Sequence, residues 1–189
     1  PRPVPPTRRP PMNAPASPPP AGGTWLGHPR GLAVLFMTEM WERFSYYGMR
    51  SLLVLYMVDH LFVRPEVGAE VLGFRALKGA LESAFGPLGP QALSSQVYGL
   101  YTGFVYLTPF FGGMLADQLL GRRKAVVAGG VLMAIGHFLM AAEGLFFVAL
   151  MFLIIGNGCF KPNISTQVGG LYAPGDPRRD RAYGIFYVG

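Results

Sequence analysis

Charged side chains inside an apolar stretch are the first candidates for chemistry in this sequence. Within the segment 29–59, four charged residues and two tyrosines lie between residues 39 and 50, and they are Glu39, Glu42, Arg43, Tyr46, Tyr47 and Arg50. On a helix that turns 100° per residue, these six fall within an arc of about 140°. A charge at the centre of a membrane costs at least ~2.5 kcal/mol and normally faces protein or a water-filled cavity. The spacing therefore predicts one functional face on this helix.

A lysine in a later apolar run is the second candidate. Lys161 follows the apolar residues 145–160 and precedes Pro162. At about 1.5 Å per residue from the cytoplasmic helix ends, Lys161 lies roughly 15 Å deep and Glu39 to Arg43 roughly 15 to 20 Å deep. A buried glutamate and lysine that pair and separate would act as a proton switch, because pairing favours the charged form of each. The alternative is a static ion pair or a lysine that extends to the interface.

The remaining polar groups give weaker signals. Tyr101 and Tyr106 lie in the apolar stretch 96–117, where each either packs or lines a cavity. Three histidines have no neighbours at metal-ligand spacing, and they are His28, His60 and His137. We therefore expect no metal site. Cys159 has no paired base and the sequence has no phosphate-binding loop, so we expect neither an enzyme nor ATP use.

The elements that must position these residues are membrane helices. Hydrophobic residues make up 51% of the 189 residues and charged residues 14%, against roughly 25% charged in soluble proteins. Stretches long enough to cross a hydrocarbon core of roughly 30 Å recur. They lie at about 29–59, 96–117, 124–142 and 145–171, and a fifth begins near 182. We expect an all-α integral membrane protein with four transmembrane helices and the start of a fifth.

Two segments lie outside these spans. Residues 1–24 include ten prolines and no acidic residue, which predicts a disordered, basic cytoplasmic tail before the helix bundle of residues 25–189. Residues 60–95 are expected to form an extracytoplasmic loop. Within this loop four apolar residues recur at helical spacing, namely Phe74, Leu77, Leu81 and Phe85. They predict an amphipathic helix that contacts the protein or the membrane surface.

The formal net charge of +6 follows the expected topology. Ten cations lie in the tail and at the start of the first span, or in two connections: Arg2, Arg8, Arg9 and Arg30; Arg122, Arg123 and Lys124; Arg178, Arg179 and Arg181. Lysine and arginine are retained on the cytoplasmic side of a membrane. We therefore expect a cytoplasmic amino terminus and a lipid bilayer as partner, with no nucleic acid.

Three motifs together resemble one known family. The residues EMWERFSYYGMR at 39–50 look like the E-x-x-E-R-F-x-Y-Y-G-M-R motif of proton-coupled oligopeptide transporters, a branch of the major facilitator superfamily. GMLAD at 113–117 with GRRK at 121–124 resembles the superfamily's loop motif, and GCFKPNIS at 158–165 resembles the family's fourth-helix motif. The resemblance extends from about Gly27 to the end of the chain.

This resemblance implies a twelve-helix, alternating-access symporter that imports di- and tripeptides across the cell membrane. The proton is the coupling ion, and no cofactor is implied. The implied proton-coupling residues are Glu39, Glu42, Arg43 and Lys161. The implied substrate-binding residues are Arg43, Tyr47, Arg50, Tyr101 and Lys161. The chain is then expected to be an amino-terminal fragment whose partner is the missing carboxyl-terminal half.

Two other functions remain open from the residues. A cationic pocket also suits nitrate or another anionic solute, as in some plant relatives. A short chain of this kind also suits a non-transporting membrane protein that interacts with another protein.

Overall fold

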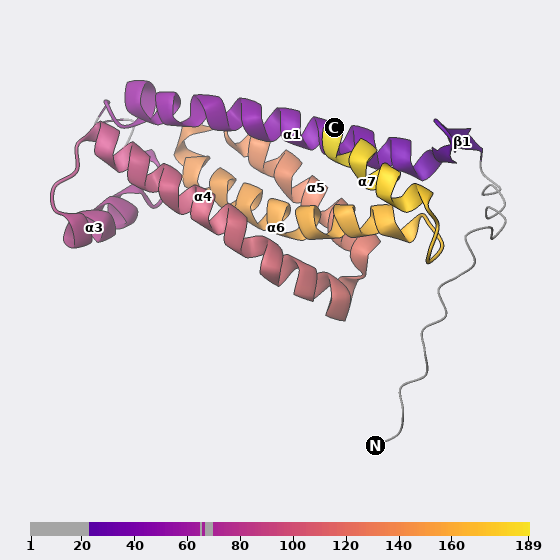
Figure 1. Cartoon of the computed structure of the whole chain (residues 1–189). Coiled ribbons are helices and arrows are strands. Elements are labelled where there is room, and N and C mark those ends of the chain that lie inside the picture. Colours follow the sequence, from indigo (N-terminus) through magenta and orange to yellow (C-terminus); the bar gives the residue numbers. More distant parts are fainter. Residues whose placement is uncertain (1–22, 65, 67–69) are drawn as a thin grey trace, which may run out of the picture.

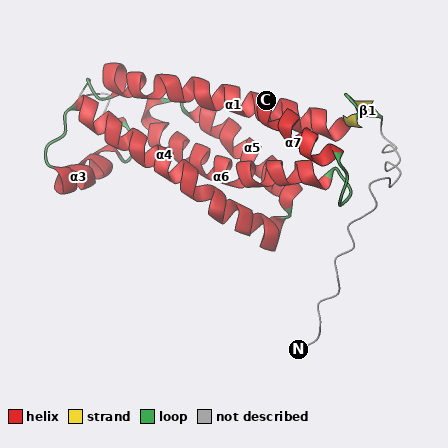
Figure 2. Ribbon diagram, in the orientation of Figure 1, coloured by secondary structure: helices red, strands yellow, loops and turns green. Residues whose placement is uncertain are grey.

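Helices make up nearly all of the computed structural model, which describes residues 23–64, 66 and 70–189 (Figures 1 and 2). The long helices are α1 (Arg30–Tyr56), α4 (Pro90–Leu115), α5 (Arg122–Leu139) and α6 (Phe146–Gly170). Shorter helices are α3 (Phe74–Phe85) and α7 (Arg178–Val188). Single turns η1 (Met57–Leu61), η2 (Ala116–Leu120) and η3 (Glu143–Leu145) adjoin the long helices. The two strands are β1 (Thr24–Trp25) and β2 (His28–Pro29).

The long helices match the apolar stretches of the sequence, with one clear difference. We expected the second span to begin at 96, whereas α4 begins at Pro90. Proline is favoured in the first turn of a helix, where its missing N–H costs no hydrogen bond. The helix therefore starts at this proline, although Gln91, Ser94 and Ser95 in the added turn are polar. The fifth helix likewise starts earlier, at Arg178 rather than near residue 182.

Helix α6 lies at the centre of the bundle and packs against α5 and α4. Helix α1 runs along one side of the bundle, with α7 beside it (Figure 1). Glycines allow these close contacts. A Cβ atom at Gly129 of α5 would lie 2.6 Å from the Gly156 carbonyl oxygen of α6. A Cβ atom at Gly112 of α4 would overlap the carbonyl of Gly158. At these two positions glycine therefore permits a close approach of the helices.

Two clusters of buried apolar side chains hold the bundle together. One includes Leu53, Met57 and Phe146 and lies toward α3. The other includes Leu32, Ile164 and Phe186 and joins α1, α6 and α7. Among the described residues, one helix, Glu143–Gly170, is long and apolar enough to cross a membrane, judged by length and composition alone. The charges of α1 lower the mean hydropathy of that helix, although it has similar length.

The structure describes little of segment 1–24 and most of segment 60–95. Of the predicted tail 1–24, residues 1–22 lie outside the described residues, and Thr24 belongs to β1. The helix expected in residues 60–95 is present as α3, with Leu81 buried. Phe74 and Leu77 pack against the first core cluster, whereas Phe85 is exposed. The apolar face of α3 therefore contacts protein over most of its length.

Candidate functional site

The two glutamates of α1 are buried, as their place on the predicted polar face requires. Glu39 is 3% exposed and Glu42 is 9% exposed. Arg43 Nε donates a hydrogen bond of 2.9 Å to Glu39 Oε1 across one helical turn. Trp41 and Leu52, which the helical wheel places on the far side, are both largely exposed. The glutamates therefore lie on the buried side of α1, while these two apolar residues lie on its exposed surface.

Glu42 contacts a residue of α6 that the sequence reasoning missed. Asn157 Nδ2 donates a hydrogen bond of 3.1 Å to Glu42 Oε1, and Asn157 is 2% exposed. Asn157 precedes Lys161 by four residues, so both side chains lie on the same face of the helix. This spacing could have identified Asn157 from the sequence, because an amide one helical turn from an intramembrane lysine faces the same neighbouring helix.

Lys161 lies next to the same cluster. Its Nζ is 5.4 Å from the centre of the Tyr46 ring, a distance typical of a cation–π contact. Lys161 also attracts the Glu42 carboxylate through space. Within the part of the chain that the structure describes, Lys161 forms no ion pair shorter than 4.0 Å. The structure therefore places Lys161 beside the glutamates. It does not show the direct ion pair that the proton-switch hypothesis expects in one of its two states.

Arg50 and the tyrosines of α4 form the next part of the cluster. Arg50 Nε donates a hydrogen bond to the Tyr98 hydroxyl, and the guanidinium lies 5.4 Å from the centre of the Tyr98 ring. Tyr98 was missed by the sequence reasoning, although it lies three residues before Tyr101 on the same helix. Tyr101 is buried, whereas Tyr47 is 56% exposed and Tyr106 is 68% exposed. The structure thus brings Arg50 and Tyr101 to the cluster and directs Tyr47 to the surface.

A cavity of about 320 Å³ opens between α1, α4, α5 and α6 at this cluster. Its polar lining comes from Glu42, Ser45, Tyr46, Tyr101, His137 and Asn157. Ser45 Oγ and His137 Nε2 lie 2.6 Å apart and join α1 to α5. The described residues contain no group of three histidine, cysteine or acidic side chains that could hold a metal ion. The polar groups that line the cavity are therefore carboxyl, amide, phenol, hydroxyl and imidazole groups.

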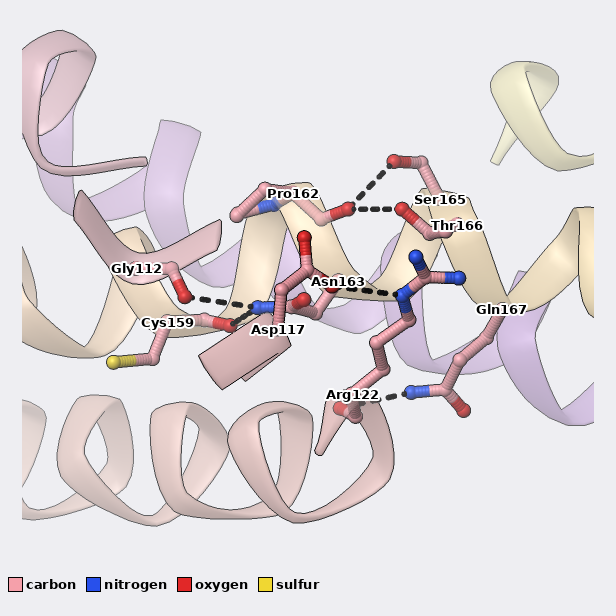
Figure 3. Close-up of polar contacts among 9 residues, drawn as sticks. All are labelled: Gly112, Asp117, Arg122, Cys159, Pro162, Asn163, Ser165, Thr166 and Gln167. Carbon is pink, nitrogen blue, oxygen red and sulfur yellow. Dashed lines mark hydrogen bonds and ion pairs between the residues drawn. The ribbon is translucent and has the colours of Figure 1, made fainter. Parts of the chain in front are cut away.

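The residues of the other two motifs mainly connect backbone segments (Figure 3). Asn163 Nδ2 donates to the Gly112 carbonyl at 3.4 Å and so ties α6 to α4. Gln167 donates to the Arg122 carbonyl at 3.4 Å, and Arg122 Nε donates to Asp117 at 3.3 Å. These contacts hold the turn between η2 and α5 against the end of α6. They fix the position of α6, the helix that carries Lys161 and Asn157.

A second set of contacts closes the same end of the bundle. His28 of β2 lies 2.8 Å from the Tyr172 hydroxyl, and Arg178 donates to the Gly27 carbonyl at 3.4 Å. Arg178 also pairs with Asp176 at 2.7 Å. The hydrogen bonds from the Arg178 side chain and backbone lower the pKa of Asp176 below its ordinary value of 3.8. The hairpin before α1 and the connection after α6 therefore lie side by side.

Known proteins with similar sequences are peptide transporters. A family model described as the POT family matches residues 123–189. Peptide transporter YePEPT of Yersinia enterocolitica is 40% identical over 176 residues, which are 90% of this chain and 30% of that protein. A di-/tripeptide transporter of Lactococcus lactis is 43% identical over 169 residues, which are 88% of this chain and 30% of that protein.

Solved structures agree with the sequence matches. A mutant of a peptide transporter POT in complex with alafosfalin has a TM-score of 0.70 and 37% identity, over 88% of this chain and 30% of that one. A POT family transporter in complex with 5-aminolevulinic acid has a TM-score of 0.66 and 36% identity, over 88% and 30% of the two chains. The chain thus spans about 30% of the length of the relatives it matches. Those relatives are membrane transporters and not enzymes. These matches and the helical bundle show that the chain is similar in sequence to peptide transporters of the POT family and shares their fold, that of the major facilitator superfamily.

Proposed function

We propose that this chain forms part of a proton-coupled symporter that imports di- and tripeptides by alternating access. The observation that carries the proposal is the pair of buried glutamates on α1, Glu39 and Glu42, with the partly buried Lys161 of α6 beside them. Buried ionisable groups in membrane helices are costly and mark ion or substrate pathways. The related proteins named as di-/tripeptide transporters support the same substrate class.

The substrate side of the cluster is cationic. Arg43, Arg50 and Lys161 together provide three positive charges for the carboxylate of a peptide, and arginine suits carboxylates because it donates in a fixed fork. Tyr101 lies within the cluster, and Tyr47 follows Tyr46 on the exposed side of α1. In this proposal the two tyrosines line the path of the peptide. Affinity then rests on the peptide ends and backbone, so that side chains can vary.

The coupling side consists of Glu39, Glu42, Arg43 and Lys161. Protonation of a glutamate weakens its attraction for a nearby cation, because only the charged carboxylate attracts it. Lys161 lies over the Tyr46 ring and not in an ion pair, so it has an alternative position when a glutamate is neutral. A lysine that moves between a carboxylate and an aromatic ring would link proton binding to the relative position of α1 and α6.

The proposed orientation has a cytoplasmic amino terminus in the cell membrane, with the 60–95 segment outside and the proton as the only coupling species. Its support is the position of the basic connections. Arg178 contacts the hairpin before α1, and the end of α6 contacts Arg122 at the start of α5 (Figures 1 and 3). Three basic segments therefore share one end of the bundle. Positive residues collect on the cytoplasmic side.

The test is uptake of a labelled dipeptide by vesicles that contain the complete protein, with and without an inward proton gradient. Accumulation that depends on the gradient and is reduced by unlabelled dipeptides supports peptide symport. Accumulation that nitrate reduces and dipeptides do not would assign the cationic cluster to an inorganic anion. Absence of uptake by correctly inserted protein would contradict transport of peptides.

A further inference from the structure

The hydrogen bond between Asn157 and Glu42 is one half of a known two-bond arrangement. A carboxylic acid and a primary amide form a ring in which the amide N–H donates to the acid carbonyl and the acid O–H donates to the amide oxygen. The first of these bonds is present, since Asn157 Nδ2 donates to Glu42 Oε1 at 3.1 Å. The second bond needs a proton on the other carboxyl oxygen.

The two atoms that the second bond would join are both buried and unsatisfied. Glu42 Oε2 and Asn157 Oδ1 have no hydrogen-bond partner among the residues that the structure describes. Two acceptor oxygens cannot bond to each other, and leaving a buried acceptor without a donor is unfavourable. One proton on Glu42 provides a donor from one oxygen and satisfies the other.

We propose that Glu42 and Asn157 form a proton-binding site, in which a proton taken up by Glu42 Oε2 is donated to Asn157 Oδ1 and closes the ring. The Glu42 carboxylate gains one proton, and its negative charge is neutralised. The Asn157 amide thus holds Glu42 in both states, as a donor to the carboxylate and as donor and acceptor to the acid. The role of this site in transport rests on the proton coupling proposed above.

The neighbouring glutamate is a weaker candidate for the proton. Glu39 accepts a charge-assisted hydrogen bond from Arg43, and an adjacent cation favours the charged form of a carboxylate. Glu42 has only a neutral amide as its hydrogen-bond partner in the described residues. The amide accommodates either protonation state, whereas an arginine accommodates only the carboxylate.

Other titratable groups face Glu42 from every helix around the cavity. They are Glu39, Arg43 and Tyr46 on α1, Tyr101 on α4, His137 on α5 and Lys161 on α6. Together these groups set the pH at which Glu42 takes up its proton. The midpoint of a titration therefore does not identify the site, and the identity of the protonated group must be read directly.

The test is infrared difference spectroscopy of the complete transporter in lipid, between alkaline and acidic pH. A protonated carboxyl group gives a carbonyl band, and hydrogen bonds to that group lower the band's frequency. We expect one such band that disappears in Glu42→Gln and persists in Glu39→Gln. In Asn157→Leu the band persists but moves to the higher frequency of an acid without an amide partner. Asn157→Ser replaces the amide with a smaller side chain and should shift the band to higher frequency as well.

Asn163→Leu is the matched control, because Asn163 is an equally buried asparagine of α6 that bonds only to backbone carbonyls. Its band should not move. Persistence of the band in Glu42→Gln, or an unchanged frequency in both Asn157 variants, overturns the proposed site. Because the spectrum needs no substrate, an intact band beside absent uptake contradicts peptide transport and leaves the proton site standing. Proton-driven uptake with no Glu42 band contradicts the site alone.

Discussion

The contact between α5 and α6 depends on the absence of a side chain at Gly129. In Gly129→Ala, the new Cβ would lie 2.6 Å from the Gly156 oxygen and 2.8 Å from the Phe160 nitrogen. Cβ atoms essentially never approach other atoms closer than 3.0 Å, so the two backbones must separate by about 0.4 Å or more. Neither atom belongs to a side chain that could rotate away. Overpacking of this kind costs about 1–3 kcal/mol.

The next residue provides the matched control. A Cβ at Gly130 would have nothing within 4 Å, so Gly130→Ala adds the same methyl group on the same helix without a clash. Alanine is favoured over glycine inside a helix by up to about 1 kcal/mol. Thermal unfolding of the complete transporter in detergent should therefore give a lower Tm for Gly129→Ala and an equal or higher Tm for Gly130→Ala. Equal Tm values for the two variants would refute the packing reasoning.

Three further outcomes follow from the described contacts. Tyr98→Phe removes the hydroxyl that accepts from Arg50 and should raise the KM for a dipeptide about fivefold, the equivalent of one hydrogen bond of ~1 kcal/mol. Because Arg178 lowers the pKa of Asp176, its contribution to stability is present above the unfolded pKa and is lost as pH falls through the lower folded pKa. The protection factor for hydrogen exchange in the α6–α7 connection, which corrects for the intrinsic effect of pH, should therefore be high at pH 7 and fall only below about pH 4, whereas in Asp176→Ala it should be low at both pH values. Tyr172→Phe removes the contact with His28 and should loosen the hairpin before α1, which limited proteolysis near residue 26 would detect as faster cleavage than in wild type.

The sequence predicted the helices well because each long helix is an apolar stretch bounded by charges, glycine or proline. It also predicted the polar face of α1, since periodicity alone places Glu39, Glu42 and Tyr46 together. It did not give the early start of α4, because polar residues around Pro90 hid a helix that extends past the apolar stretch. Mean hydropathy alone also understates α1, because its charged residues lower the value for the helix.

The sequence predicted the ionised residues of the cluster and Tyr101, but it did not predict Asn157 and Tyr98. Lys161 and Arg50 stand out because a charge in an apolar run needs an explanation. Asn157 and Tyr98 carry no charge, and only the packing of α6 and α4 against α1 shows that they contact Glu42 and Arg50. The position of Lys161 over Tyr46 also depends on side-chain packing between two helices, which periodicity cannot give.

The most direct test of the proposed coupling compares driven uptake with exchange in the Lys161→Ala variant of the complete protein. The first assay is dipeptide accumulation under an inward proton gradient. The second is exchange of labelled for unlabelled dipeptide without a gradient, which reports that the variant is folded and inserted. We predict that the variant loses gradient-driven accumulation and keeps measurable exchange. Gradient-driven accumulation at the wild-type level in Lys161→Ala would contradict a proton switch between α1 and α6.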